Sequence, residues 1–230
     1  MDARLTLESA RQGALRTLPV AFSVFAYGMV YGLLTRQAGL TLAESVLSSG
    51  LIFAGSSQFV SLDMWSHPLP VTALVFTTCV VNLRHVLMSA SLTPWMRGLP
   101  SRSTLPLLFL LSDESWAMTY GAVSRGKSDL GFLLGSGLLI WAAWMAATIT
   151  GRLAGAVIPA PEAFGLDFAF TAVFLSLLAG LWKGKGDIPP WVVAAVTALL
   201  VDHFLPGKWY IVIGGLAGSL TGLWGNNADR

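Results

Sequence analysis

Long apolar runs alternate with short polar breaks along almost the whole chain. The runs are repeatedly about 17 to 25 residues long, which matches an α-helix that crosses roughly 30 Å of hydrocarbon. They lack the alternation of apolar and polar residues over about ten positions that marks a transmembrane β-strand. The pattern therefore predicts helical membrane segments. We place them at residues 18–34, 42–65, 71–92, 105–123, 130–150, 164–182, 191–205 and 209–224.

Residues that start and stop helices mark the limits of these segments. Thr41 followed three residues later by Glu44 has the form of a capping box, which predicts a helix that starts at about residue 42. Residues 1–16 form a polar or amphipathic lead-in, so Pro19 is expected in the first turn of the first helix. Pro94 is expected in the loop after the third segment.

The second segment leaves one choice open. Residues 42–65 can form one helix, a helix unwound at residues 55–57, or two half-helices that re-enter the same side. The chain is therefore expected to be an all-α polytopic membrane protein with seven or eight transmembrane segments, one of them broken or re-entrant. No linker divides it, so residues 1–230 are expected to form a single transmembrane domain.

The distribution of Lys and Arg between the loops bears on orientation, because cytoplasmic loops are enriched in these residues. If every segment crosses, the loops on the N-terminal side carry more Lys and Arg than the opposite loops. If residues 42–65 re-enter, the two sides become nearly equal. The charges favour plain crossings with the N-terminus in the cytoplasm.

Composition agrees with a membrane protein and excludes other classes. Of the 230 residues, 54% are hydrophobic and 11% are charged, whereas soluble domains carry about 25% charged residues. The net charge of +2 is spread along the chain, which argues against a nucleic-acid-binding face. The single cysteine, Cys79, cannot form an intramolecular disulfide or a CxxC pair. No removable signal peptide is evident, so the first helix is expected to act as the membrane signal.

No motif points to catalysis, to a metal or to a cofactor. His67, His85 and His203 are scattered, and HExxH, GxSxG and Walker patterns are absent. A hydrolase that used Ser56 or Ser57 would have only His85 nearby in sequence as a base. We therefore expect neither an enzyme nor a bound cofactor.

Four small or polar residues interrupt the second apolar segment: Gly55, Ser56, Ser57 and Gln58. Polar groups at membrane depth are tolerated where they face protein or a water-filled cavity. A helix broken at this glycine would expose backbone N–H and C=O groups that can hold a zwitterionic ligand. The alternative is a packing face, on which small residues let helices approach and the glutamine bonds a neighbouring helix.

The third segment carries a cation among polar neighbours. Arg84 lies between Asn82 and His85, and a guanidinium within a membrane segment needs an anion or an aqueous path. It can serve inside the protein or extend to the membrane surface. His85 adds a group that titrates near neutral pH and is a candidate proton carrier, although a structural hydrogen bond is an alternative role.

Asp113 and Glu114 are expected near the centre of the fourth segment, pointing about 100° apart around their helix. Carboxylates within a membrane segment are typical of a proton-binding site or of a site that binds a ligand's ammonium group. The alternative is a structural ion pair with Arg84. Asp167 and Asp202 lie nearer the ends of their segments, where contact with interfacial water explains them.

Three blocks of sequence together form a specific pattern: FAGSSQF at residues 53–59, NLRHVLMSASL at residues 82–92 and Asp113-Glu114-Ser115. This pattern resembles the AzlC family of branched-chain amino acid permeases. Ser56 and Ser57 stand where members often have two alanines, which adds two hydroxyl groups. The resemblance implies an exporter of branched-chain and similar apolar amino acids in the bacterial cytoplasmic (inner) membrane. It also implies a small, separately encoded hydrophobic partner subunit of the AzlD type.

The expected function is a secondary transporter that exports valine, leucine, isoleucine and methionine, coupled to protons because the chain has no ATP-binding element. A passive pore and an assembly subunit that binds no ligand are the alternatives, and the sequence leaves a homo-oligomer open. The residues expected to bind substrate are Phe53, Gly55, Ser56, Ser57, Gln58, Phe59, Asn82, Arg84 and Trp116, and those expected to couple protons are His85, Asp113 and Glu114.

Overall fold

The computed structural model describes residues 5–66, 68–155, 184–205 and 209–228, and the single positions 175, 179 and 182. Every regular element within these residues is a helix, which confirms the predicted all-α class. Four helices are long and apolar enough to cross a membrane, so the protein is a membrane protein with several candidate spans. The segment expected at 164–182, with Asp167, lies outside the described residues apart from three single positions, and the total of seven or eight segments stays a prediction.

The helices form two compact units. Unit 1 comprises Met1–Asp63 and Val81–Phe164, and unit 2 comprises Met64–Val80 and Gly165–Arg230. Every residue that the sequence assigns to substrate or proton binding belongs to unit 1. The site is therefore described within unit 1 alone.

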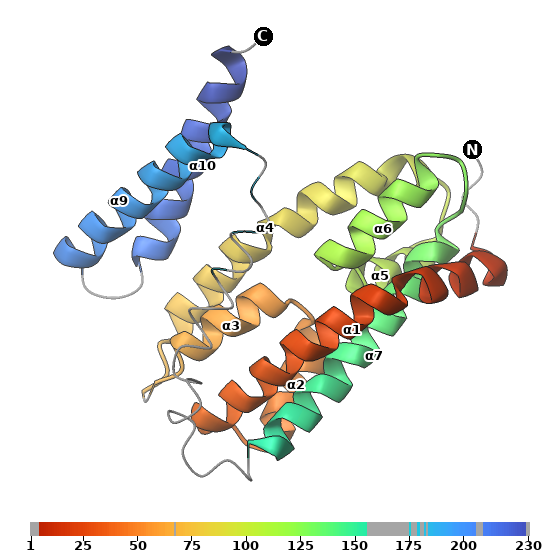
Figure 1. The fold of residues 1–230 in the computed structure, drawn as a ribbon, viewed down its shortest axis with the longest axis horizontal. Helices are drawn as coiled ribbons and strands as arrows, with labels where there is room; N and C mark the ends of the chain where they lie inside the picture. Colours follow the sequence, from red (N-terminus) through yellow and green to blue (C-terminus); the bar gives the residue numbers. More distant parts are fainter. Residues whose placement is uncertain are drawn as a thin grey trace. The chain divides into compact units, whose positions relative to one another are not determined.

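Helices α1 (Leu7–Gln37) and α7 (Gly131–Ala154) run parallel along each other and form the framework of unit 1 (Figure 1). Ala10 faces Gly135 near their first turns, and Met29 faces Gly151 near their last turns. At both places a Cβ on the glycine would overlap the carbonyl group of the facing residue. Glycine therefore lets the two backbones touch, as small residues do between membrane helices.

Helix α1 begins at Leu7 and not at residue 18, so the predicted place of Pro19 in a first turn is wrong. The physical reason is a cap at Thr6, whose hydroxyl accepts the N–H of Ser9 at 3.2 Å and donates to the Asp129 carboxylate at 2.7 Å. Burial raises the pKa of Asp129, but hydrogen bonds from surrounding N–H and hydroxyl groups outweigh it and leave the pKa below its usual value. The charged carboxylate thus ties the start of α1 to the start of α7.

Residues 42–65 form two short helices, α2 (Leu42–Ile52) and α3 (Gly55–Asp63), and the capping box of Thr41 and Glu44 starts α2 as predicted. In a straight helix, residues 48 and 58 would lie about 15 Å apart. The side chain of Gln58 nevertheless donates to the hydroxyl of Ser48 at 3.1 Å. The chain therefore folds back after α2, and the plain crossing favoured by the loop charges is wrong.

The predicted fourth segment, 105–123, is also divided, into α5 (Ser101–Phe109) and α6 (Asp113–Val123). Its expected continuity is wrong because the capping box at Ser112 starts a new helix within the apolar run. The preceding helix, α4 (Val71–Met96), extends past the predicted loop residue Pro94, which lies inside it.

Contacts between side chains give the direction of α6. The indole of Trp116 donates to the Ser91 hydroxyl at 2.8 Å, and the rings of Tyr120 and Trp95 lie 5.9 Å apart. The residue number increases by four on both helices from the first pair to the second. Helix α6 therefore runs in the same direction as this part of α4. Since α5 returns from the end of α4, α5 and α6 form a second helical hairpin.

The two hairpins enter unit 1 from opposite ends and meet at their tips. We define the first tip as Phe53 and Ala54, and the second tip as residues 110–112. The first hairpin starts where α1 ends, whereas the second starts where α1 begins. The rings of Phe53 and Phe109 lie 6.2 Å apart, so the tips are neighbours. The second tip lies against Gly137 of α7, and Gly55, directly after the first tip, lies against Trp144 of α7.

Unit 2 contains an antiparallel pair of helices, α9 (Ile188–Phe204) and α10 (Trp209–Ala228), preceded by the short 3₁₀ helix η2 (Lys185–Asp187). Gly214 of α10 lies against Ala198, whereas Gly218, one turn later, lies against Ala194. The pair therefore packs through small residues. His203 lies one residue before the end of α9, which agrees with the predicted position near a helix end.

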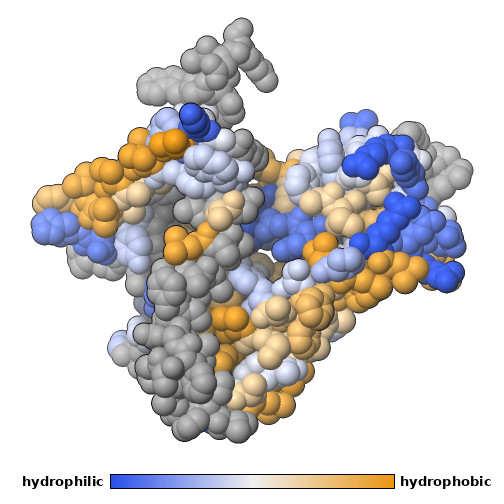
Figure 2. Space-filling model, in the orientation of Figure 1, coloured by the Kyte–Doolittle hydropathy of each residue, from blue (hydrophilic) through white to orange (hydrophobic). Residues whose placement is uncertain are grey.

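Cations gather at the end of unit 1 where α1 and α7 begin, which we call the N-terminal end. Figure 2 shows hydrophilic side chains at this end beside an apolar flank. Cytoplasmic surfaces of membrane proteins are enriched in Lys and Arg. The N-terminal end carries Arg11, Arg16, Arg97, Arg102, Arg125 and Lys127, whereas the opposite end of the described unit carries Arg36 and Arg152.

This asymmetry predicts that the N-terminal end faces the cytoplasm. In a Cys79→Ser background, a membrane-impermeant maleimide applied to intact cells is expected to label Gln37→Cys and not Ser124→Cys. Both positions are exposed, at opposite ends of unit 1, and permeabilised cells should label both. Labelling of Ser124→Cys in intact cells would contradict the orientation.

Candidate functional site

The first tip turns at Phe53, which has φ 45° and ψ 43°. This left-handed conformation is uncommon for a residue with a Cβ. The predicted break at residues 55–57 is displaced, because these residues form the first turn of α3. Gly55 instead permits close approach, since a Cβ there would lie 3.2 Å from the Trp144 ring of α7. The tip therefore bends before the glycine and rests on α7.

The side chain of Gln58 joins the two helices of the first hairpin to each other and to α7 through hydrogen bonds. The side chain is 1% exposed, and its Nε2 donates to the hydroxyls of Ser48 at 3.1 Å and Ser49 at 3.4 Å. Its Oε1 accepts a hydrogen bond from the Trp144 indole at 3.2 Å. The hydroxyls of Ser49 and Thr148 are 2.7 Å apart, which links α2 to α7. These contacts support the packing interpretation of this glutamine.

Phe59 belongs to an aromatic cluster between α3, α1 and α7. Its ring centroid lies 4.9 Å from that of Tyr27 and 5.5 Å from that of Tyr31. Tyr31 stacks on Trp144 at 5.4 Å. Phe59 is 0% exposed, so the described structure encloses it and gives it a packing role.

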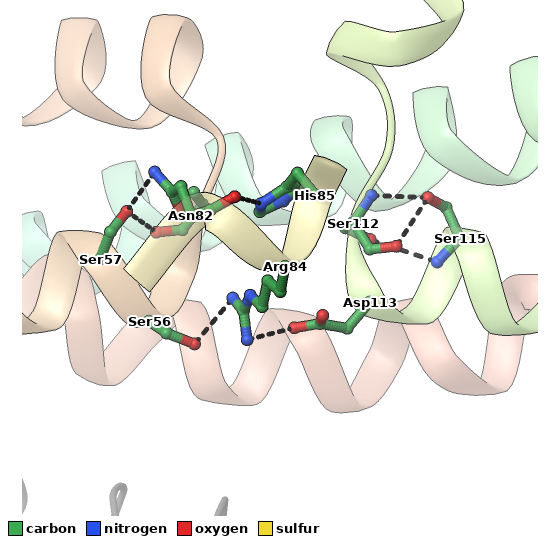
Figure 3. A network of polar contacts seen from close by, with 9 residues as sticks. Ser56, Ser57, Asn82, Arg84, His85, Ser112, Asp113 and Ser115 are labelled. Atoms are coloured by element: carbon green, nitrogen blue, oxygen red, sulfur yellow. Dashed lines mark hydrogen bonds and ion pairs between the residues drawn. The ribbon is translucent and has the colours of Figure 1, made fainter. Parts of the chain in front are cut away.

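Arg84 of α4 connects the two hairpins (Figure 3). One terminal nitrogen donates to the Ser56 hydroxyl at 3.0 Å, and the other pairs with the Asp113 carboxylate at 2.8 Å. Ser56 is in the first turn of α3, and Asp113 is the first residue of α6. The ion pair considered from the sequence is therefore present, and it lies where two half-helices begin.

Asn82 and His85 flank this arginine on α4 (Figure 3). The Asn82 amide donates to the Ser57 hydroxyl at 3.2 Å, which anchors α4 to the first turn of α3. The Nδ1 atom of His85 lies 3.2 Å from the Asn82 carbonyl oxygen. This local contact matches the structural alternative for the histidine.

The second tip positions the acidic residues. Ser112 caps α6, and its hydroxyl accepts a hydrogen bond from the N–H of Ser115 at 3.2 Å. In turn, the Ser115 hydroxyl accepts a hydrogen bond from the N–H of Ser112 at 2.8 Å. Asp113 and Glu114 therefore lie in the first turn of α6 and not in the middle of a helix, which corrects the predicted placement. Carboxylates at this position are stabilised by the helix dipole.

Several polar atoms beside Arg84 have no hydrogen-bond partner among the described residues. They are the Tyr27 hydroxyl, Oδ1 of Asn82 and Nε of Arg84, all of them buried. The Tyr27 hydroxyl also lies within electrostatic range of Glu114. Because buried polar groups are normally paired, these atoms mark a place for a polar ligand or water.

Trp116 lies apart from the two aromatic residues with which the sequence grouped it. Its indole bonds Ser91, and its ring stacks on Tyr120 at 5.7 Å. It packs against an apolar cluster that includes Leu92 and Leu133. The structure therefore does not bring Trp116 together with Phe53 or Phe59.

The arrangement suits recognition of a zwitterion. The N-terminal ends of α3 and α6 lie on either side of Arg84, and backbone N–H groups at such ends favour an anion. The first turn of α6 supplies carboxylates that can accept an ammonium group. No group of His, Cys, Asp and Glu within the described residues could hold a metal ion.

Tyr27, Tyr31 and Trp144 contact the predicted site residues Phe59 and Gln58 but were not predicted from the sequence. They lie in long apolar runs, where an aromatic side chain is indistinguishable from one that faces lipid. A usable signal was present in α2, where Ser45, Ser48 and Ser49 recur at a helical spacing on one face. That face predicts a polar contact with a neighbouring helix.

Comparisons with known proteins show a family and several membrane-protein relatives that the chain is similar to. The family described as "AzlC protein" matches residues 19–158. "Branched-chain amino acid transport protein AzlC" of Bacillus subtilis is 29% identical over 72% of this chain and 65% of its own length. "Inner membrane protein YgaZ" of Escherichia coli is 28% identical over 92% and 89% respectively. An uncharacterised membrane protein of Archaeoglobus fulgidus is 29% identical over 93% and 94%. No solved structure matches the chain.

Proposed function

The chain belongs to the AzlC family, and on that premise we propose that it is a secondary transporter that exports branched-chain and related apolar amino acids across a bacterial cytoplasmic membrane. The AzlC family is a family of transport proteins and not of enzymes. The proposed substrates are valine, leucine, isoleucine and methionine. The proposed energy source is the proton gradient.

The position of Arg84 between two half-helix N-termini carries this proposal. The substrate's carboxylate binds the guanidinium, since paired N–H groups match a carboxylate and form strong hydrogen bonds. Backbone N–H groups in the first turn of α3 add to the attraction. The substrate's ammonium group meets Glu114, and the unpaired Oδ1 of Asn82 and Tyr27 hydroxyl accept further hydrogen bonds. These groups together recognise the part that all amino acids share.

Apolar residues at the tips select the side chain. The Phe53 ring is 5% exposed and lies beside Phe109, which is 44% exposed. An aliphatic side chain that packs on the exposed Phe109 ring gains free energy by leaving water, whereas a polar side chain would lose its hydrogen bonds there. The tips therefore favour aliphatic substrates.

Competition for Arg84 couples transport to protons. When the substrate carboxylate binds the guanidinium, it displaces Asp113 from a contact of 2.8 Å. A carboxylate that loses its cation partner within the protein favours the protonated form. Asp113 then takes up a proton, and the two hairpins lose one of their links. His85 is the second candidate proton carrier.

The proposal includes a small hydrophobic partner subunit of the AzlD type. Many apolar side chains of the described residues are exposed, including Leu7 at 86% and Phe22 at 77%. Lipid and partner helices are both suitable neighbours for them. A second copy of this chain would be a further neighbour of the same chemistry.

Replacement of Glu114 tests the assignment. In proteoliposomes that contain the chain and its partner, Glu114→Gln is expected to lower leucine transport driven by a pH gradient by about tenfold or more, because a hydrogen bond to a charged group contributes about 1.5–3 kcal/mol. Glu44→Gln is the matched control. It should transport normally, since glutamine also closes a capping box.

Three results would contradict parts of the proposal. If Glu114→Gln and Asp113→Asn each retain normal pH dependence, the proton-coupling assignment is lost. Movement of leucine only down its gradient would identify a passive pore. If valine, leucine, isoleucine and methionine leave the thermal stability of the complex unchanged, the chain is an assembly subunit that binds no ligand.

A further inference from the structure

A cavity of about 200 Å³ opens at the N-terminal end of unit 1, away from the two tips. Three cationic side chains line it, Arg16 of α1 together with Arg125 and Lys127 from the loop after α6. Its remaining wall is apolar and includes Ala117 and Met118 of α6. The cavity therefore combines a cationic mouth with an apolar side.

The three cations have no described carboxylate in the cavity to neutralise them. Asp129, the nearest acid in sequence, is held elsewhere by the hydroxyl of Thr6 at 2.7 Å and the N–H of Gly131 at 2.8 Å. Like charges that share a small space repel one another. A bound anion would remove that repulsion, so the charge pattern calls for an anionic ligand.

The end of α6 does not explain these cations. Lysine and arginine often stabilise the last carbonyl groups of a helix. Here backbone N–H groups serve the carbonyls of three of the last four residues: Ser124 donates to Tyr120 at 3.0 Å, Gly126 to Val123 at 3.0 Å and Lys127 to Ala122 at 3.1 Å. Arg16 lies within α1, far from that helix's C-terminal end. The side chains thus remain available for a ligand.

The position of the Arg125 side chain supports a charged target at the cavity. A Cβ at Gly121 would lie 3.5 Å from a terminal nitrogen of Arg125, so this guanidinium lies over the α6 backbone at the cavity. Guanidinium groups bind phosphate oxygens through paired N–H groups. Two arginines and one lysine around one opening make a phosphate the best-matched anion.

We propose that this cavity binds the phosphate of an anionic phospholipid headgroup in the leaflet at the N-terminal end. The lipid source fits better than free phosphate because the cations lie beside the apolar side chains of Met118 and Phe132, and exposed apolar residues of α1, Leu15 at 54% and Leu18 at 52%, lie at the same end of the unit. An acyl chain can lie against apolar side chains at this end while the phosphate meets the cations. Basic pockets between membrane helices hold lipid headgroups in this way. The site is separate from the proposed transport function.

Native mass spectrometry of the purified full-length chain tests the assignment. Phosphatidylglycerol is expected to remain bound in preference to phosphatidylcholine. The variant Arg16→Gln, Arg125→Gln, Lys127→Gln should lose affinity by roughly a hundredfold, since each cation near an anionic lipid surface contributes about fivefold. Arg97→Gln with Arg102→Gln, which removes cations from the same end but not from the cavity, should keep the preference. Lys127→Gln alone, in an exposed loop, provides a second readout if the triple variant does not fold.

Three outcomes would overturn the proposal. Equal retention of both lipids would exclude recognition of the anionic headgroup. Undiminished phosphatidylglycerol binding by folded Lys127→Gln and by the triple variant would place the lipid elsewhere. If inorganic phosphate raises thermal stability as much as phosphatidylglycerol does, and only with the cavity cations present, the ligand is a free anion and not a lipid.

Discussion

Arg84→Ala is expected to reduce transport by about tenfold to a hundredfold or more, because charge-assisted hydrogen bonds contribute about 1.5–3 kcal/mol each. The guanidinium contacts Ser56 at 3.0 Å and Asp113 at 2.8 Å, so its loss frees both hairpins at once. It also removes the proposed partner of the substrate carboxylate. Arg84→Lys should recover little, since an ammonium group on a single stem cannot reproduce the two separate contacts of a guanidinium.

A double variant distinguishes a binding role from a structural one. Removal of Arg84 alone leaves Asp113 without its cation, whereas Arg84→Ala with Asp113→Asn removes both charges together. The two side chains are 36% and 46% exposed, so we expect the double variant to match Arg84→Ala closely in thermal stability and to stay inactive in leucine efflux. Recovery of transport in the double variant would mean that the pair is only a structural link.

Gly135→Ala is expected to prevent correct pairing of α1 and α7 and to lower stability by about 3 kcal/mol or more, beyond the usual range for an overpacked site. A Cβ at this position would overlap the Ala10 carbonyl oxygen and lie 2.6 Å from its carbonyl carbon. The obstacle is backbone, which cannot rotate away as a side chain can. The whole of α1 would have to move. The aromatic cluster around Phe59, which packs the first hairpin against α1 and α7, would move with it.

Gly50→Ala is the matched control for this change. It adds the same methyl group to α2, where a Cβ would meet only the side chain of Met145, at 3.5 Å and 3.6 Å. Folded yield and thermal midpoint in detergent should stay near those of the natural protein for Gly50→Ala and fall sharply for Gly135→Ala. Similar values for both variants would show that the close contact is dispensable.

The two helix breaks show which features of a helix end a sequence pattern can predict. Glycine is the residue that best tolerates a left-handed backbone, so the sequence placed the first break at Gly55. The structure bends at Phe53, with φ 45°, and uses the glycine to approach Trp144. A local preference of about 1–2 kcal/mol per residue is small enough for tertiary packing to override. The break was foreseen, but its position depended on α7.

The second break shows a different limit. Residues 105–123 are apolar enough to suggest one helix, and the acids then fall at its centre. The capping residues Ser112 and Ser115 are visible in the sequence, but a serine pair inside an apolar run is also compatible with an unbroken helix. Only the return of the chain alongside α4 makes the new helix start evident.

The sequence by itself determined that this protein is helical and membrane-embedded, because apolar length and period follow directly from the distance that a helix must cross. It also identified the polar residues worth attention, since a charge in an apolar run is costly wherever it lies. Tertiary structure decided how these residues meet. Partners such as Arg84 and Asp113, or Ala10 and Gly135, are distant along the chain, and only the folding back of two hairpins against α1, α4 and α7 brings them into contact.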